Sequence, residues 1–113
     1  ISDIIIFHLD VNENEEVIAS NKNKVFIVKE NLEHIVSIKN IHSLCYADDF
    51  IWVNNKRKTS LFDIKANELY EYDYLDGIPG DLINHLECDN EWVWFSTNNG
   101  LAMYNWNRYH FNE

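Results

Sequence analysis

Glycine, proline and cysteine are scarce in this sequence. Its 113 residues include three glycines, one proline and two cysteines. So little glycine and proline excludes collagen-like and proline-rich chains. Two cysteines cannot form the disulfide framework of a small secreted scaffold. Apolar runs are short as well, because the longest, residues 4–7, falls far below the roughly 18 residues of a membrane-spanning helix.

Positive charge is also in short supply. Nine lysines and arginines face nineteen carboxylates, which gives a formal net charge of -10. A field of that sign repels phosphate backbones and anionic membrane surfaces, so we expect neither nucleic acid nor direct membrane contact. The sequence has no signal peptide and no glycosylation sequon, and residue 1 is Ile. We therefore expect a processed product or a piece of a longer chain.

The residues that are present are those of a folded β protein. The chain is 46% hydrophobic and 14% aromatic, unlike disordered chains. Runs rich in branched and aromatic residues are interrupted by clusters of Asn, Asp, Gly and Lys, the pattern of strands joined by turns. Residues 60–74 come nearest to a helical pattern. Tyr70 and Tyr72 nevertheless alternate with Glu71 and Asp73, which favours strands.

Three segments of the chain repeat one order of parts. Each has an apolar strand that ends near Asp, a turn, a second strand, an Asn-rich turn, a third strand and a fourth. Their second strands recur at intervals of about 40 residues, the period of four-stranded propeller blades. The expected strands are residues 4–10, 16–20, 24–29 and 34–39; then 41–47, 50–54, 60–64 and 68–74; then 82–89, 92–97, 101–106 and 108–111.

Blades explain why the strands are apolar on both faces. One meander of ~40 residues cannot bury two apolar faces alone, whereas blades that stack around an axis bury both. Residues 92–95, Trp-Val-Trp-Phe, are apolar in succession and fit this burial. The sequence therefore predicts an all-β fold, a β-propeller segment of three four-stranded antiparallel blades, at about residues 1–40, 41–81 and 82–113.

The third segment resembles the two-component regulator propeller repeat. Residues 76–83 read DGIPGDLI and residues 94–101 read WFSTNNGL, close to that family's turn and strand pattern. The match is specific over residues 76–104, moderate in the second segment and weak in the first, where Val17 replaces Trp. Asn99–Gly100 suits a hairpin with positive φ. Pro79, between Gly77 and Gly80, suits a rigid connection, and Trp94 is expected between blades.

The resemblance implies a function. Such repeats form extracytoplasmic sensor regions of hybrid two-component histidine kinases of the Bacteroidetes type, with oligosaccharides as implied ligands. We accordingly expect a non-enzymatic, ligand-sensing segment on the periplasmic or extracellular side of the membrane, within a protein that can carry a kinase elsewhere. A propeller scaffold for protein–protein interaction is the alternative. A propeller lyase or hydrolase would need a central cluster of His, Arg and carboxylates, and no recurrent set of these residues is found.

Several groups are candidates for metal binding. Asp10, Asn12 and Asn14 have the alternating oxygens that begin a calcium loop, but Glu15 stands where the loop needs Gly and Asn21 where it needs Glu. We expect a solvated hairpin turn instead. His42 and His85 lie in first strands of neighbouring blades and could meet near the axis. Ordinary hydrogen-bonded or exposed histidines are the expectation, so no metal or cofactor is assigned.

The remaining reactive side chains have structural interpretations. Adjacent sheets pack ~10 Å apart, too far for a disulfide, so we expect Cys45 and Cys88 to be buried free thiols. Ser43, Ser60 and Ser96 lack a recognisable His and Asp arrangement.

Charged and aromatic groups near the strand ends are the other candidates. Asp48–Asp49 is expected in an exposed turn, and Lys56-Arg57-Lys58 at a solvated hairpin tip that could contact an acidic partner. Tyr74, Trp106 and Tyr109 could stack on sugars, but we expect packing between blades. No ligand-binding residue is assigned.

Three blades leave a ring incomplete, because propellers typically have 4–8 blades. We expect exposed outer faces that include Ile5, Phe7, Trp94 or Tyr104, and therefore no stable monomer. The missing cover would come from further blades of the same polypeptide, which we favour, or from a second copy that closes a six-bladed ring.

Overall fold

The computed structural model describes residues 5–55, 58–72 and 82–106. These residues form three antiparallel sheets whose strands follow the order of the chain. The first blade contains β1 (His8–Val11), β2 (Val17–Ser20), β3 (Lys24–Val28) and β4 (Leu32–Ser37). The second contains β5 (Ser43–Ala47), β6 (Phe50–Asn54), β7 (Thr59–Asp63) and β8 (Glu68–Tyr72). The third contains β9 (Ile83–Cys88), β10 (Val93–Thr97) and β11 (Gly100–Tyr104).

The all-β, antiparallel prediction is confirmed. The strand expected at residues 108–111 lies outside the described residues, so the third sheet is described with three strands. Two strands begin more than one residue later than expected. β1 starts at His8, although the Phe7 amide still donates to the Ser20 carbonyl at 2.8 Å. β5 starts at Ser43, because Asn40 has a φ of 56° and the Ile41 amide donates back to the Lys22 carbonyl of the first blade.

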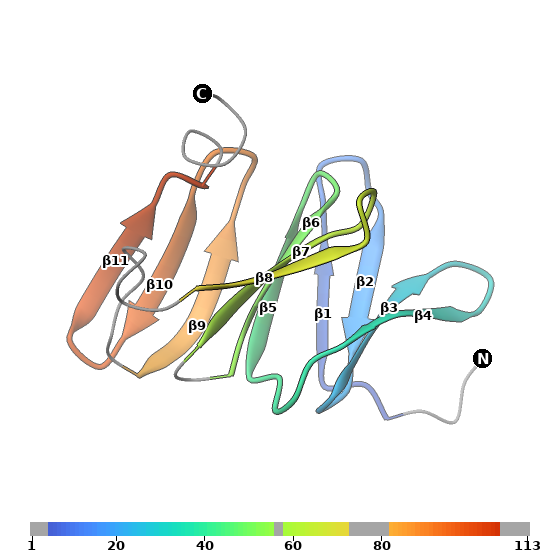
Figure 1. Cartoon of the computed structure of the whole chain (residues 1–113), viewed down its shortest axis with the longest axis horizontal. Coiled ribbons are helices and arrows are strands. Elements are labelled where there is room, and N and C mark those ends of the chain that lie inside the picture. Colours follow the sequence, from blue (N-terminus) through green and yellow to red (C-terminus); the bar gives the residue numbers. More distant parts are fainter. Residues whose placement is uncertain (1–4, 56–57, 73–81, 107–113) are drawn as a thin grey trace.

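The three sheets stand side by side like the leaves of a fan (Figure 1). The first strand of the second blade, β5, contacts both β1 and β9, so the first strands of all three blades lie next to one another. The fan is open, because the outward faces of the first and third sheets have no neighbouring sheet among the described residues.

Two apolar cores fill the spaces between the blades. On β6, Ile51 and Val53 pack toward the first blade and Trp52 packs toward the third, which is the two-faced burial expected of a blade. The core between the first and second blades contains Ile18, Val25, Ile41, Leu44, Tyr46, Ile51, Val53 and Phe62. The core between the second and third contains Cys45, Ala47, Trp52, Leu61, Ile83, Leu86, Val93, Phe95 and Trp106.

Aromatic rings make up the centre of the second core. Trp106 is buried, its ring lies 5.2 Å from Phe50 and 6.3 Å from Trp52, and its Nε1 donates to the Asp89 carbonyl at 3.0 Å. Trp106 is therefore a packing residue. Tyr104 was expected on an outer face, but its ring lies 6.3 Å from Trp52 inside this core. The expectation was wrong because Tyr104 pairs with Val93, which faces the second blade. Tyr74 and Tyr109 lie outside the described residues.

The two cysteines do not remain free thiols. Cys45 on β5 and Cys88 on β9 form a disulfide, with their Cα atoms 5.9 Å apart. The expectation failed because the ~10 Å spacing holds for sheets stacked in parallel planes. Blades converge toward their first strands, and β5 and β9 come within the 4.4–6.8 Å range of disulfide geometry there.

The open faces of the fan are apolar. On the first blade, Phe7 is 61% exposed and Leu9 is 68% exposed, and Ile5 is also exposed, as expected. On the third blade, Leu101 and Met103 are exposed. Partly buried Trp94 lies with them, because Val93 and Phe95 on either side of it face the second blade. Trp94 would lie between blades only if another blade followed.

Candidate ligand pocket

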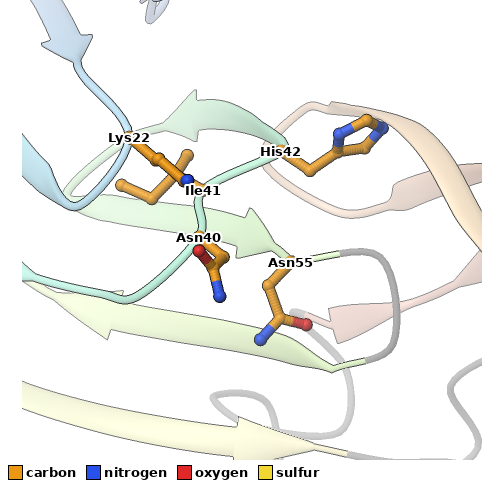
Figure 2. A pocket seen from close by; sticks show the side chains of 5 residues that line it. All are labelled: Lys22, Asn40, Ile41, His42 and Asn55. Carbon is orange, nitrogen blue, oxygen red and sulfur yellow. The ribbon is translucent and has the colours of Figure 1, made fainter.

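A pocket of about 350 Å³ lies at one edge of the first two blades, where β2 and β6 end and β5 begins. Its lining residues are Lys22, Asn40, Ile41, His42 and Asn55 (Figure 2). The volume is within the range of small-molecule sites, roughly 300–1,000 Å³. Three connections supply the lining: the β2–β3 turn, the β4–β5 connection and the β6–β7 connection.

The β2–β3 turn is shaped by an asparagine. The Asn21 Oδ1 accepts hydrogen bonds from the amides of Asn23 at 3.0 Å and Lys24 at 2.8 Å. The Asn21 amide in turn donates to the Lys24 carbonyl at 3.1 Å. Asparagine favours such turns because its side chain bonds to backbone groups two or three residues ahead. The turn thereby holds Lys22 at its tip.

The β4–β5 connection is tied to that turn. The Ile41 amide donates to the Lys22 carbonyl at 2.7 Å, and the Asn40 amide donates to the Asn23 Oδ1 at 3.0 Å. On the other side, the His42 amide donates to the carbonyl of Asn54 at the end of β6, at 2.9 Å. Because backbone bonds fix both ends of the connection, the pocket wall forms when the two blades fold.

The side chains give the pocket a polar lining. Figure 2 shows Asn40 and Asn55 reaching toward the same space from different connections. The Lys22 side chain extends over the backbone of Ile41, and the His42 ring points away from Asn40. The Asn55 Oδ1 accepts the Lys58 amide at 2.8 Å, which fixes the orientation of this side-chain amide. Apolar Ile41 is buried beneath them in the first core.

Buried polar residues gather behind the pocket. Among the described residues, all the buried polar side chains except Asn12 lie at this edge of the blades: Ser20, Ser43, Asn54, Thr59 and Ser60. The Asn54 Nδ2 donates to the Ser43 Oγ in a buried pair. Burial of polar groups is costly unless they are hydrogen-bonded, and among the described residues the buried Ser20 Oγ and Thr59 Oγ1 have no hydrogen-bond partner. The core between the blades thus ends in a polar layer beside the pocket.

The connections that line the pocket differ in charge from the turns after β1 and β5. The connections that line the pocket contain Lys22, Lys39 and Lys58 and no carboxylate. Lys56 and Arg57 belong to the β6–β7 connection but lie outside the described residues; Lys58 is exposed, as expected. The opposite edge contains the acidic turns, with Glu13, Glu15 and Glu16 after β1 and Asp48 and Asp49 after β5. The connections that line the pocket are thus basic, although the chain as a whole is acidic.

The residues considered for metal binding have other contacts. His42 lines the pocket, whereas the His85 Nε2 lies 3.1 Å from the Glu87 Oε1 on the exposed side of β9. The described ranges contain no group of three or more His, Cys, Asp or Glu side chains that could hold a metal ion.

The turn with alternating oxygens joins two blades. The Asn12 Oδ1 accepts the amides of Asn14 at 3.0 Å and Glu16 at 2.9 Å. The Asn12 Nδ2 donates to the Asp48 carbonyl of the second blade at 3.0 Å. A fully solvated turn was expected, yet Asn12 is buried because it bridges the two blades.

The neighbouring Asp10 also crosses between blades, since its Oδ2 accepts the Tyr46 amide at 2.8 Å. Burial of Tyr46 raises the pKa of its phenol to about 12, and the charges of Glu16, Asp49 and Asp48 act in the same direction.

The glycines and proline of the repeat motif and the three candidate serines are located as follows. Gly100 has a φ of +115°, in the region that favours glycine, and it follows the two-residue Asn98–Asn99 loop. Gly77, Pro79 and Gly80 lie outside the described residues. Ser43 and Ser60 are buried and Ser96 is exposed. The sequence analysis did not predict Lys22 and Asn40 as lining residues of a pocket. The pattern that could have indicated them is a set of connections that contain basic residues and no carboxylate.

No protein-family model and no curated protein matches this sequence. Solved structures do match. Hydrazine synthase from Kuenenia stuttgartiensis has a TM-score of 0.70 at 14% identity, over 91% of this chain and 33% of that one. The extracellular domain of a protein named as a one component system, BT4673 from B. thetaiotaomicron, has a TM-score of 0.67 at 15% identity, over 88% and 14%. The N-terminal domain of Nup159 has a TM-score of 0.61 at 13% identity, over 91% and 27%.

These comparisons establish the fold. The chain spans a third or less of the length of each of these three structures. The described part has no helix long and apolar enough to cross a membrane. At such low identity the similarity concerns architecture alone, and the architecture is that of a β-propeller, of which this chain forms an open segment of three blades.

Proposed function

We propose that this chain is an extracytoplasmic, ligand-sensing propeller segment of a signalling protein and that it recognises an oligosaccharide. The observation that carries the proposal is the preformed pocket at the junction of the first two blades. One structurally similar protein is an extracellular domain named as that of a one component system, and this likeness supports a sensory role. The resemblance of residues 76–104 to the two-component regulator repeat supports the same class.

The pocket lining suits sugar hydroxyls. Each hydroxyl both donates and accepts hydrogen bonds, and the side-chain amides of Asn40 and Asn55 do the same. Backbone hydrogen bonds already hold the connections that carry Asn40 and Asn55. Binding of a ligand therefore costs little conformational entropy in the protein. The pocket joins two blades, so a ligand that occupies it would stabilise one packing of these blades over others. Such a difference in affinity is what a sensor requires.

The disulfide supports an extracytoplasmic location. Disulfides form and persist in oxidising compartments such as the periplasm and the cell exterior, and are rare in the cytosol. The Cys45–Cys88 bond joins neighbouring blades within the folded core. We propose no catalysis by this segment. Turnover of a polysaccharide or ester by the purified chain, abolished by a single substitution, would contradict that proposal.

Calorimetry of the whole chain against a glycan panel tests the binding proposal. We expect weak binding, because a propeller ligand usually contacts loops from several blades. Asn40→Gly combined with Asn55→Ala should abolish the signal, since it removes both amides from the pocket and Gly tolerates the positive φ of residue 40. Asn98→Ala, in the β10–β11 hairpin of the third blade, is the matched control and should bind normally. Failure of every glycan to bind, or equal loss of binding in the control, would contradict the proposal.

A scaffold for another protein is the second candidate. The observation in its favour is the exposure of large apolar side chains on the outer faces, such as Phe7, Leu9, Leu101 and Met103. Such faces are typical of surfaces that another polypeptide covers. A protein partner would bury these faces and leave the pocket open. Substitutions at Leu101 or Met103, rather than at Asn40, would then abolish binding.

A further inference from the structure

We infer that the pocket recognises an acidic sugar residue, whose carboxylate is held near the Lys22 ammonium while its hydroxyls contact Asn40 and Asn55. This inference rests on the proposed function and specifies its ligand class. The ligand is an oligosaccharide that contains uronic acid, rather than a neutral glycan.

The first argument is the local charge. The net charge of the chain is -10, but exposed charges farther apart than a Debye length, about 8 Å at physiological ionic strength, are largely screened. The connections that line the pocket contain only basic charges. The acidic turns lie at the other ends of the strands, and five-residue strands such as β5 and β6 span about 16 Å. Lys22 is therefore nearer to the pocket than these acidic turns are.

The second argument is that the charge of Lys22 is available. Lys29 pairs with Glu33 and Lys65 pairs with Asp49 at 3.0 Å. Within the described part of the chain, Lys22 forms no such ion pair, although it lies in a molecule with an excess of carboxylates. Its backbone carbonyl is held by the Ile41 amide at 2.7 Å. The backbone is thus fixed while the ammonium remains exposed at the pocket.

The third argument concerns the kind of anion. A carboxylate accepts charge-assisted hydrogen bonds from an ammonium and from amide N–H groups, and both donors are present here. A polymer with closely spaced phosphates or sulfates would bring many negative charges close to the acidic remainder of the chain. A sugar with one carboxylate per ring places a single charge in the basic pocket and keeps hydroxyls for the asparagines.

Calorimetry with a galacturonic acid trimer and a neutral galactose trimer tests the inference on the whole chain. We expect the acidic trimer to bind about tenfold more tightly, the effect of one good charge-assisted contact. Its affinity should fall when the salt concentration is raised from about 50 to about 200 mM, as expected for screened charges. Lys22→Gln should reduce the tenfold preference to about onefold, since Gln is polar and only slightly shorter than Lys but has no charge.

Lys65→Gln is the matched control. It changes the net charge by the same amount at the acidic edge, and the preference should persist. An unchanged thermal midpoint of Lys22→Gln would show that the variant folds; the substitution leaves in place the backbone carbonyl that accepts the Ile41 amide. Equal affinity of the wild type for both trimers would overturn the inference while the proposed function stands. A preference that survives Lys22→Gln would also overturn it. Absence of binding by either trimer and by the whole panel would overturn both.

Discussion

Asp10 shows how one side chain joins two blades. Its Oδ2 accepts the backbone amide of Tyr46 at 2.8 Å, so a residue of β1 satisfies a donor on β5. We predict that Asp10→Ala lowers the free energy of unfolding by about 1.5–3 kcal/mol, the range for hydrogen bonds to charged groups. Asp10→Asn keeps an acceptor oxygen and should cost less. Chemical denaturation of the three proteins measures the order. Equal stability of Asp10→Ala and the wild type would contradict the assignment.

Because of Tyr46, the stability of this junction between the blades depends on pH in the alkaline range. Its folded pKa is raised from 10.0 to about 12, by burial first and then by Glu16, Asp49 and Asp48. The folded protein therefore retains a proton that the unfolded chain loses. The folded state thus favours the neutral phenol of Tyr46. The resulting contribution to the free energy of unfolding is fully present below pH 10.0 and is lost as the pH rises through about 12.

The comparison with Tyr46→Phe tests the prediction, because the variant has no phenol to titrate. Denaturation at a series of pH values should show the wild type losing stability relative to the variant between pH 10.0 and about 12. A constant difference between the two proteins over this range would show that the phenol titrates alike in the folded and unfolded states.

At the scale of elements, the Cys45–Cys88 disulfide fastens β5 to β9 and so fastens the second blade to the third. It closes a loop with a sequence separation of 43 residues, and loops of this size typically make a disulfide worth about 2–4 kcal/mol. We predict that a reductant lowers the midpoint of thermal unfolding. The double variant Cys45→Ser and Cys88→Ser should already be destabilised and should not respond to reductant. Alkylation of both thiols in the unreduced native chain would contradict the bond.

The strands and their order were predictable because they depend on local patterns. Turn residues separate the strands, and apolar residues on both faces of β6 indicate burial between neighbouring blades. The separation between first strands was not predictable in this way. It depends on how the blades converge, and for that reason the disulfide was missed and Tyr104 was placed on the wrong face. The pocket was missed because hydrogen bonds such as Ile41 N–H to Lys22 O join turns that show no periodic pattern.

The whole molecule is an open fan, and its two outward faces decide how it exists in solution. Leu9 and Leu101 are 68% and 72% exposed on opposite ends of the fan, and Ile5, Phe7 and Met103 accompany them. Burial of a large apolar side chain is worth roughly 1.5–3 kcal/mol. Several such side chains together rival the net stability of a small domain, about 5–15 kcal/mol. We therefore propose that further blades of the same polypeptide cover these faces, with a second copy as the alternative.

The isolated chain tests this directly. We predict that at micromolar concentration it self-associates by light scattering or binds a hydrophobic dye, because no other sheet among the described residues covers its outward faces. Leu9→Lys together with Leu101→Lys should weaken the association and the dye signal, since both side chains are exposed and neither belongs to the two cores. Leu69→Lys, on the outermost strand of the second blade, is the matched control and should change little. A wild-type monomer that unfolds cooperatively and binds no dye would show that three blades suffice, because their end faces would then need no cover.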